Sequence, residues 1–497
     1  MSKAVVTLRP DRLTLAHLVT ALAGPGTTLA AGAVGQTPVR STVIDSRLAK
    51  PGCLFIALRG ERDDGHRFIP DALKRGAVAV IAEQEPVSGC HILDLRGETT
   101  ETAWQIADLP ICLLVPDSLA GLQQAAAHWR RQHDVRVVGI TGSIGKTMTK
   151  EVTAAVLASA YATLKSEGNY NNEIGLPLTL LHLRRHHECV VLEMGMYDVG
   201  EIAHLAEIAR PQIGVVTNVG PSHLERLGTI ERIAEAKTEL PRALPVAGEG
   251  GVAILNADDA RVRAMAEQTR ARIFTYGLDP DADLWASHIE SQGLEGIQFQ
   301  LHYQRETVHA GVPLLGRHSV HTALAAAAVG LVEDLAWDEI MEGLADQSTQ
   351  LRLVAVSGPA GSTLLDDTYN ASPASSIAAL NLVNELAAGE EAGRKIAVLG
   401  DMYELGSYEE EGHRMVGRRV RDIADILVAV GTLGHIVGRE ALDAGMPPHK
   451  VHLVEDNATA IDLLRDLLEA GDIVLVKGSR GMAMEEIVTG LQVGDVP

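Results

Sequence analysis

The sequence predicts an α/β protein of three domains, and three observations lead to that prediction. The chain has 497 residues, about three times the roughly 150 residues of a common domain. Short apolar segments alternate with segments of helical periodicity, as in ECVVLEMG, PQIGVVTNVG and GVAILNAD. Several apolar segments end in Gly, Asp or Glu, where open parallel sheets place their ligand loops. We therefore expect parallel sheets with binding loops at their carboxyl edges.

The first domain is predicted to span residues 1–115 and to be a small α/β unit. It contains the apolar segment CLFIALRG, the helix-like segment FIPDALKRG and a second apolar segment, AVAVIAE. Pro116, Asp117 and Ser118 then form a helix-start signal, which is followed by apolar residues at helical spacing as far as Trp129. A second domain is therefore expected to begin near residue 116.

The second domain, residues 116–348, is predicted to hold a mostly parallel sheet with helices on both faces. Between residues 297 and 315 the apolar period shifts toward two, which indicates an antiparallel extension. The third domain, residues 349–497, repeats the α/β pattern in RKIAVLGDM, DILVAVG and DIVLVKGSRG. We predict that it is Rossmann-like, with its loops after the strand ends.

Composition excludes several classes of partner. A formal net charge of −22 and an aromatic content of 3% argue against a general nucleic-acid or anionic-membrane surface. No apolar run approaches the roughly 18 residues of a membrane span, and the first residues lack the apolar core of a signal peptide. The four cysteines are isolated, which fits a reducing cytoplasm: Cys53, Cys90, Cys112 and Cys189. We expect a cytoplasmic protein.

The segment VVGITGSIGKTMTKEV has the features of a phosphate-binding loop, although Ile140 stands where the Walker motif has a glycine. An apolar strand leads into Gly142 and Gly145 and then into Lys146 and Thr147 at the head of a helix. Such a turn aims backbone N–H groups and the helix dipole at an anion. Lys146 would add charge near the terminal phosphates, and the Thr147 hydroxyl would bind Mg²⁺. The alternative is a glycine-rich turn that binds nothing.

Three further residues could complete a nucleotide and metal site. Glu193 follows four apolar residues in VVLEMG, so its carboxylate is expected at a strand end, where it could hold Mg²⁺ directly or through water. His223 follows another expected strand end, and Lys237 lies on a helix just beyond it. Taken alone, the three residues are also compatible with a solvated acid, a loop histidine and a solvated helix lysine.

The order of the motifs is more informative than any one motif. TGSIGKTMTKE, GNYNNEIGLPLTLL, VLEMGMYDVGEIAHLAEIARP, TNVGPSHLERLGTIERIAEAK, NADD, GRHSVHTALAAAA and DDTYNASPASSIAAL together resemble the Mur ligases of peptidoglycan synthesis. The resemblance begins with STVIDSRLAKPGCLFIALRGERDDGHRFI and ends with GDMYELG and VKGSRGM, so it covers essentially the whole chain. Within the family, the sequence is most similar to the type that adds D-alanyl-D-alanine.

The resemblance implies an ATP-dependent amide ligase that joins D-alanyl-D-alanine to UDP-N-acetylmuramoyl-tripeptide. The family transfers the γ-phosphate of ATP to a substrate carboxylate, and an amine then displaces phosphate from the acyl phosphate. By motif matching, ATP would be bound by Thr141, Gly142, Ser143, Gly145, Lys146, Thr147, Ser319, Arg352 and Asp367. The expected partners are these substrates and no nucleic acid, and the expected state is a monomer.

The resemblance also implies the catalytic and substrate residues. Two magnesium sites and the catalytic machinery would use Lys146, Thr147, Glu193, His223 and Lys237, where Lys237 matches a lysine that is carbamylated in related ligases. The substrates would contact Thr42, Ser46 and Arg47 for the uridine diphosphate, Asn169, Asn171 and Asn172 near the phosphate, and Tyr369, Asn370 and Lys477 for the dipeptide. For the three Asn residues of GNYNNEIG, turn formation is the alternative.

The sequence departs from the family pattern at three positions. Ser319 and Thr322 stand where the family usually has Asn residues that help to hold adenine, and Ser372 stands where Asn is common. A hydroxyl cannot present the paired donor and acceptor of an amide, so adenine or dipeptide selectivity is expected to differ. Two alternatives to the dipeptide ligase therefore stay open: a Mur-type ligase for another amine or carboxylate carrier, and a non-catalytic paralogue that binds a nucleotide sugar.

Overall fold

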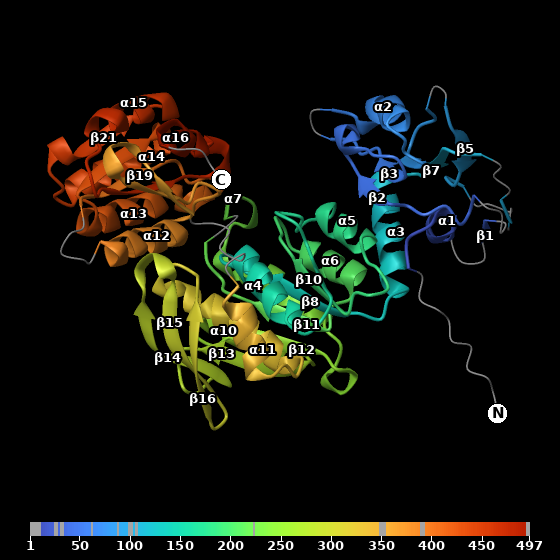
Figure 1. Ribbon diagram of the computed structural model, residues 1–497, viewed down its shortest axis with the longest axis horizontal. Helices are drawn as coiled ribbons and strands as arrows, with labels where there is room; N and C mark the ends of the chain where they lie inside the picture. Colours follow the sequence, from blue (N-terminus) through green and yellow to red (C-terminus); the bar gives the residue numbers. More distant parts are fainter. Residues whose placement is uncertain are drawn as a thin grey trace. The chain divides into compact units, whose positions relative to one another are not determined.

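The structure is a computed structural model (Figure 1). It describes residues 11–23, 28–29, 34–60, 63–86, 89–97, 103–104, 108–221, 224–346, 354–387 and 393–493. By their contacts the described residues group into two compact units, one within Met1–Gly139, Tyr161–Met196 and Gly200–Ile213 and the other within Ile140–Ala160, Tyr197–Val199 and Gly214–Pro497. No helix in the described part of the chain is both long and apolar enough to cross a bilayer.

The first domain is built on a five-stranded sheet in which all neighbouring strands are parallel. In spatial order its strands are β2 (Ser41–Val43), β3 (Cys53–Ile56), β4 (Ala79–Ala82), β7 (Ile111–Leu114) and β5 (His91–Asp94). A separate parallel pair joins β1 (Thr28–Leu29) to β6 (Ala103–Trp104). Helices α1 (Leu15–Ala23) and α2 (Ile69–Lys74) belong to the same region. Because β3, β4 and β7 are buried along their whole length, the prediction of a small α/β domain is confirmed.

Helix α3 (Ser118–Arg131) begins where the sequence predicts a helix start. The Asp117 carboxylate accepts a hydrogen bond of 2.8 Å from the Ala120 N–H, which satisfies one of the unpaired donors of the first turn. On its apolar face Leu122, Ala126 and Trp129 are buried. The capping residue and the periodicity thus fix this helix locally.

The region after α3 contains a nine-stranded sheet. In spatial order its strands are β16 (Glu306–Val312), β15 (Ile297–Tyr303), β14 (Leu284–Ser291), β13 (Arg272–Gly277), β12 (Val252–Asn256), β11 (Ile213–Val216), β8 (Arg136–Thr141), β10 (Cys189–Glu193) and β9 (Thr163–Lys165). The pairs β12·β13, β13·β14 and β9·β10 are parallel. The pairs β14·β15 and β15·β16 are antiparallel, which confirms the predicted extension.

The helices of this region are α4 (Lys146–Ala158), α5 (Gly175–Leu181), α6 (Glu201–Ala209), α7 (Leu224–Leu227), α8 (Ile230–Ala243), α9 (Ala260–Ala264), α10 (Val320–Val332) and α11 (Trp337–Leu344). Helix α4 packs against α10 and α11. A Cβ at Gly343 of α11 would lie 2.3 Å from the Cα of Val156 in α4, so glycine is needed for this approach. The close packing fixes the helix that follows the phosphate-loop motif.

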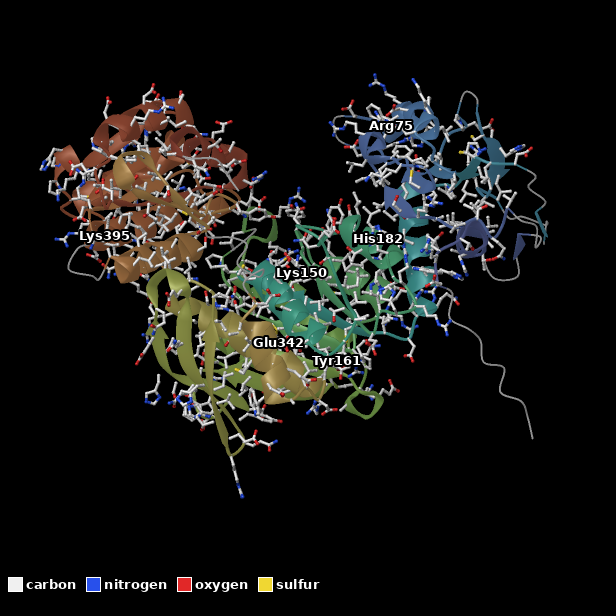
Figure 2. All side chains as sticks on the ribbon, in the orientation of Figure 1. Arg75, Lys150, Tyr161, His182, Glu342 and Lys395 are labelled. Carbon is white, nitrogen blue, oxygen red and sulfur yellow. The ribbon has the colours of Figure 1, made fainter. Side chains whose placement is uncertain are left out.

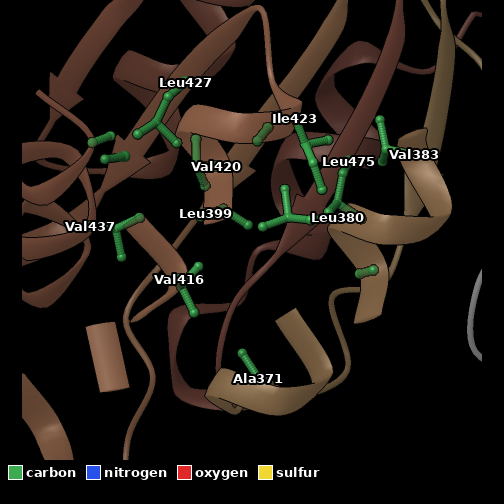
Figure 3. Packing of buried hydrophobic residues seen from close by; sticks show 14 of the residues in the cluster. Ala371, Leu380, Val383, Leu399, Val416, Val420, Ile423, Leu427, Val437 and Leu475 are labelled. Atoms are coloured by element: carbon green, nitrogen blue, oxygen red, sulfur yellow. The ribbon is translucent and has the colours of Figure 1, made fainter. Parts of the chain in front are cut away.

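The C-terminal domain has a six-stranded sheet in the order β17 (Val354–Ser357), β18 (Thr363–Asp366), β22 (Ile473–Lys477), β19 (Lys395–Leu399), β20 (Ile426–Val430) and β21 (Val451–Val454). Only β17 runs antiparallel to its neighbour among the described strands of this sheet. The helices are α12 (Pro373–Leu386), α13 (Glu409–Ile423), α14 (Gly431–Asp443), α15 (Asn457–Leu467) and α16 (Glu485–Leu491). Figure 3 shows residues of the buried cluster that joins strands such as β19 to α12 and α13. The Rossmann-like prediction is confirmed.

Candidate nucleotide and ligase site

The phosphate-loop motif forms the turn between β8 and α4, as the sequence predicts. Gly142 has φ = 150° and Gly145 has φ = 81°, both in the region that favours glycine. A Cβ at Gly142 would lie 1.9 Å from Oγ1 of Thr217, so a side chain at this position would displace the loop or the threonine. Gly145 is the N-cap of α4 and has no side chain to occupy the first-turn N–H groups. The start of α4 therefore has the geometry of an anion site.

Residues just after β11 brace the loop. The Thr217 hydroxyl donates to the Ile144 carbonyl at 2.7 Å, and the Asn218 amide bonds both the N–H and the carbonyl of Ile144, each at 2.9 Å. Ser143 exchanges two hydrogen bonds of 2.9 Å with the backbone of Gly220 through its hydroxyl. These bonds hold the loop in shape before any ligand binds, which lowers the entropy cost of binding.

The NADD motif supports this brace from β12. Asn256 donates from its side chain to the Thr217 carbonyl at 2.8 Å, and Asp259 accepts from the Val219 N–H at 2.8 Å. The preceding acid, Asp258, accepts a bond of 2.7 Å from His321 of α10. The motif is therefore part of the scaffold of the phosphate loop.

Lys146 folds back over its own loop. Its ammonium donates to the Gly142 carbonyl at 2.8 Å and to the Ser143 carbonyl at 3.3 Å. One turn later on α4 is Lys150, which Figure 2 labels. It is fully buried, and its ammonium lies 2.8 Å from the Glu151 carboxylate. The sequence gives no signal for this buried pair, because adjacent Lys and Glu residues on a helix are usually solvated.

Lys237 of α8 is buried, with 2% of its surface exposed. Burial lowers its pKa well below the ordinary value of 10.5, and the positive charge of Lys146 lowers it further. Among the described residues, none forms a hydrogen bond or ion pair with the Lys237 ammonium. The alternative of a solvated helix lysine is therefore wrong, and the side chain is an uncharged amine over part of the accessible pH range.

Glu193 ends β10 and is almost completely buried. Its carboxylate accepts a hydrogen bond of 2.8 Å from the Asn171 amide, and its N–H donates to the Ser166 hydroxyl at 3.2 Å. Asn171 thus lies against the predicted metal ligand and orients its carboxylate. The exposed Asn172 accepts from the N–H groups of Ile174 and Gly175 at 3.3 and 2.9 Å, as a turn-forming residue at the start of α5.

The residues predicted for the uridine nucleotide lie on one short segment of the first domain. Thr42 is a buried residue of β2, and the Ser46 hydroxyl is buried and donates to the carboxylate of Asp71. Arg47 is 83% exposed and binds the Asp45 carboxylate, with Nη2 at 2.6 Å from Oδ2. Of the three predicted residues, Arg47 offers an accessible charged group.

In the C-terminal domain the structure brings together three predicted residues. The buried Lys477 ammonium lies 2.6 Å from the Asp367 carboxylate and donates to the Asn370 carbonyl at 2.8 Å. Tyr369 is 39% exposed on the same loop. Lys477 therefore links the end of β22 to the loop that follows β18.

A second cluster lies at the same edge of this sheet, in GDMYELG. Asp401 accepts from the N–H groups of Leu433 and Gly434 at 2.9 and 2.7 Å, in the first turn of α14. Tyr403 donates from its hydroxyl to the same carboxylate at 3.3 Å. The N-terminus of α14 is thus occupied by a carboxylate of the protein itself. The position of Asp401 at a strand end can be predicted from the sequence. The residues that it contacts cannot be predicted in this way.

The three departures from the family pattern have local structural roles. The Ser319 hydroxyl donates to the Leu315 carbonyl at 2.7 Å, just before α10, and Thr322 lies half-buried in the first turn of that helix. Ser372 is the N-cap of α12 and accepts from the Ser375 N–H at 3.3 Å. Because Ser and Asn are comparable N-caps, the substitution preserves the helix start. His223 and Arg352 lie outside the described residues.

Comparison with known proteins agrees with this architecture. The sequence matches the Mur ligase middle domain over residues 140–330, the Mur ligase glutamate ligase domain over 351–480 and the Mur ligase family catalytic domain over 38–101. The chain therefore belongs to the Mur ligase family.

Its relatives define the type more closely. The UDP-N-acetylmuramoyl-tripeptide--D-alanyl-D-alanine ligase of Bacillus subtilis is 36% identical over 93% of this chain and 95% of its own length. The Escherichia coli ligase of the same name is 35% identical over 90% and 92%. A crystal structure of MurF from Acinetobacter baumannii superposes with a TM-score of 0.79, at 29% identity, over 97% of this chain and 99% of that one. MurF from Thermotoga maritima in complex with ADP gives 0.72 at 27% identity, over 91% and 97%.

Proposed function

We propose that this protein is the ATP-dependent ligase that joins D-alanyl-D-alanine to UDP-N-acetylmuramoyl-tripeptide in the synthesis of peptidoglycan precursors. The observation that carries the proposal is the braced phosphate loop, with Lys146 folded over it and buried Lys237 beside it. It stands in a chain that is similar to ligases of this name over nine-tenths of its length. On this proposal residues 1–115 bind the uridine nucleotide, 116–348 bind ATP and 349–497 bind the dipeptide.

The reaction needs an activated carboxyl group, because a carboxylate is a poor electrophile. The terminal phosphoryl group of ATP passes to the tripeptide carboxylate and gives an acyl phosphate and ADP. The dipeptide amine then attacks the acyl carbon, phosphate leaves with the bonding electrons, and the amine loses a proton. Lys146 and the N–H groups at the start of α4 stabilise the charge on the transferring group. Ser143 and Gly142 hold that geometry through the loop contacts described above.

The residues present fit a magnesium site. Thr147, Glu193 and His223 would hold the ion, and hydroxyl and carboxylate oxygens are ligands that Mg²⁺ prefers. No group of three or more His, Cys, Asp or Glu side chains converges among the described residues. When bound, Mg²⁺ neutralises phosphate charge during transfer. Asn171 would orient the Glu193 carboxylate toward it.

Lys237 supplies a further part of the proposal. Its lowered pKa leaves a nucleophilic amine, which adds to the carbon of CO₂ and loses a proton to give a carbamate anion. That product would place a buried anion near the Lys146 ammonium, which attracts it, whereas a protonated Lys237 would be repelled by Lys146. The carbamate would lie near the proposed metal site. We also propose that the protein acts in the cytoplasm as a monomer.

One experiment tests the proposed activity. Purified protein with Mg-ATP should release phosphate only when UDP-N-acetylmuramoyl-tripeptide and D-alanyl-D-alanine are both present, and mass spectrometry should show the pentapeptide product. Lys146→Ala should lower kcat/KM by on the order of 100-fold or more, because one donor to the developing charge is lost. Lys395→Ala is the matched control and should leave turnover unchanged, because Lys395 is a half-buried lysine at the start of β19 whose ammonium donates to the Asn384 side chain. Phosphate release that ignores the dipeptide, or faster reaction with another amine, would contradict the proposal.

A further inference from the structure

The carboxyl edge of the C-terminal sheet has a strong excess of acidic residues. Strands β18, β22, β19, β20 and β21 are parallel, so the loops after them lie at one edge. In these loops, all within described residues 367–372, 400–408, 455–456 and 478–484, the acids are Asp367, Asp401, Glu404, Glu455 and Asp456, and the one basic residue is Arg480. An anion that approaches this edge therefore meets a single exposed cation within these loops.

A lysine at the same edge, Lys477, is not accessible to a ligand. Lys477 ends β22, is buried and is paired with Asp367 at 2.6 Å. Two of the acids are also used by the protein itself: Asp401 binds the first turn of α14, and Asp456 caps α15 through the Thr459 N–H at 2.8 Å. Within these loops, the exposed positive charge is therefore that of Arg480.

The loop that carries Arg480 is held firmly. Ser479 donates from its N–H to the Asp401 carbonyl at 2.9 Å, and its hydroxyl accepts from the Tyr403 N–H at 2.8 Å. Asn457 of α15 donates to the carbonyls of Met482 and Ala483 at 2.9 and 3.2 Å. These bonds on both sides of the arginine fix its backbone. A preorganised loop loses little entropy when a ligand binds.

The side chain of Arg480 is 67% exposed and lies 3.3 Å from the Glu485 carboxylate. An exposed ion pair of this kind is weak, and a guanidinium has five N–H donors, of which one carboxylate oxygen uses few. Tyr403 is 41% exposed, and its ring lies close to the next residue of the same loop, since a Cβ at Gly481 would be 3.0 Å from the ring. The geometry thus offers a planar fork for a carboxylate next to an aromatic surface for a small apolar group.

We infer that Arg480 binds the free C-terminal carboxylate of the incoming dipeptide. The inference rests on the proposed function, which supplies a dipeptide as the acceptor. On this inference, Arg480 is the residue that selects acceptors with a carboxylate at the end remote from the reacting amine. A guanidinium binds a carboxylate through two parallel hydrogen bonds, whereas a neutral amide at that end offers one acceptor and no charge.

The test compares D-alanyl-D-alanine with its C-terminal amide, in the wild-type protein and in Arg480→Gln. The wild type should use the amide about 10- to 100-fold less well in kcat/KM, as expected for the loss of a charge-assisted pair. Arg480→Gln should raise KM for the dipeptide by a similar factor, with a much smaller change in kcat, and should no longer distinguish the two acceptors. Arg480→Lys, which keeps the charge without the fork, should fall between them.

The matched control is Arg465→Gln, an exposed arginine of α15, which should behave as the wild type. An unchanged KM for the dipeptide in Arg480→Gln, or a retained preference for the carboxylate, would overturn the inference. A rise in KM for ATP with the acceptor preference intact would overturn it too, because Arg480 would then bind a phosphate. If the wild type releases phosphate without any dipeptide, the proposed function fails and the inference falls with it, so the two failures are distinguishable.

Discussion

Lys237 and Lys477 are both buried lysines, and their surroundings are opposite. Lys477 lies 2.6 Å from the Asp367 carboxylate, whereas Lys237 has the positive charge of Lys146 as its electrostatic neighbour. Burial disfavours a charged lysine, and a carboxylate partner offsets that effect while a second lysine adds to it. Burial alone therefore does not define the role of a lysine. Lys477 is suited to hold two loops together, and Lys237 is suited to react.

The largest expected effect is on the turnover of a Lys237 variant. Lys237→Met should lower kcat by on the order of 100-fold or more, since the proposed carbamate near the proposed metal site is lost. Lys477→Met should affect the KM for the dipeptide more than kcat, because Lys477 holds the loop that carries Tyr369 and Asn370 without itself being accessible. In ¹³C-labelled bicarbonate, NMR should detect a carbamate carbon in the wild type that is absent from Lys237→Met. Full turnover in Lys237→Met would remove the distinction between the two lysines.

For the free energy of unfolding, we expect Lys477→Met to have a larger effect than Lys237→Met. Lys477→Met leaves the carboxylate of Asp367 without its partner and should lower the free energy of unfolding by on the order of 3 kcal/mol. Lys237→Met removes an unfavourable buried charge and should be neutral or stabilising. Urea unfolding of both variants checks the prediction. The double variant Lys477→Met/Asp367→Asn is the control and should recover most of the loss, because no unpaired charge is left.

The smallest effect is a difference in pH dependence. The pKa of Lys237 is lowered in the folded protein, so between that pKa and 10.5 the unfolded chain binds more protons than the native one. The free energy of unfolding due to this group therefore rises with pH through that window, by at most about 1.4 kcal/mol per pH unit. In CO₂-depleted buffer, the wild type should become more stable relative to Lys237→Met as pH rises. Parallel pH profiles would show that Lys237 is not a perturbed lysine.

The sequence predicts the fold well because its signals are local. The apolar segments, the Asp117 cap and the shift in period before residue 315 each depend on neighbouring residues, and each is present in the structure. The phosphate loop is predicted for the same reason, since glycines with positive φ and the following lysine are adjacent in sequence. The contacts of the loop with Thr217 and Asn218 require the pairing of distant strands, which spacing alone does not reveal.

The same distinction between local signals and distant contacts applies to the site residues. Lys237 lies on a helix with charged neighbours, so periodicity could not distinguish a buried lysine from a solvated one. Asn171 and Asn172 are adjacent and chemically identical, yet one donates to Glu193 and the other accepts from the Gly175 N–H at the start of α5. The difference depends on the folded path of the chain between β9 and α5, which the two letters do not reveal. The roles of these residues in binding and catalysis stay predictions.

The carboxylate of Asp401 in the first turn of α14 has a consequence for inhibitor chemistry. A helix N-terminus usually attracts phosphates and their analogues, but here a tethered anion already occupies the N–H groups of Leu433 and Gly434. A soluble anion would have to displace a group held at very high effective concentration. Inhibitors aimed at this domain should therefore place their acidic group elsewhere and present a neutral hydrogen-bond acceptor or an apolar surface to this helix.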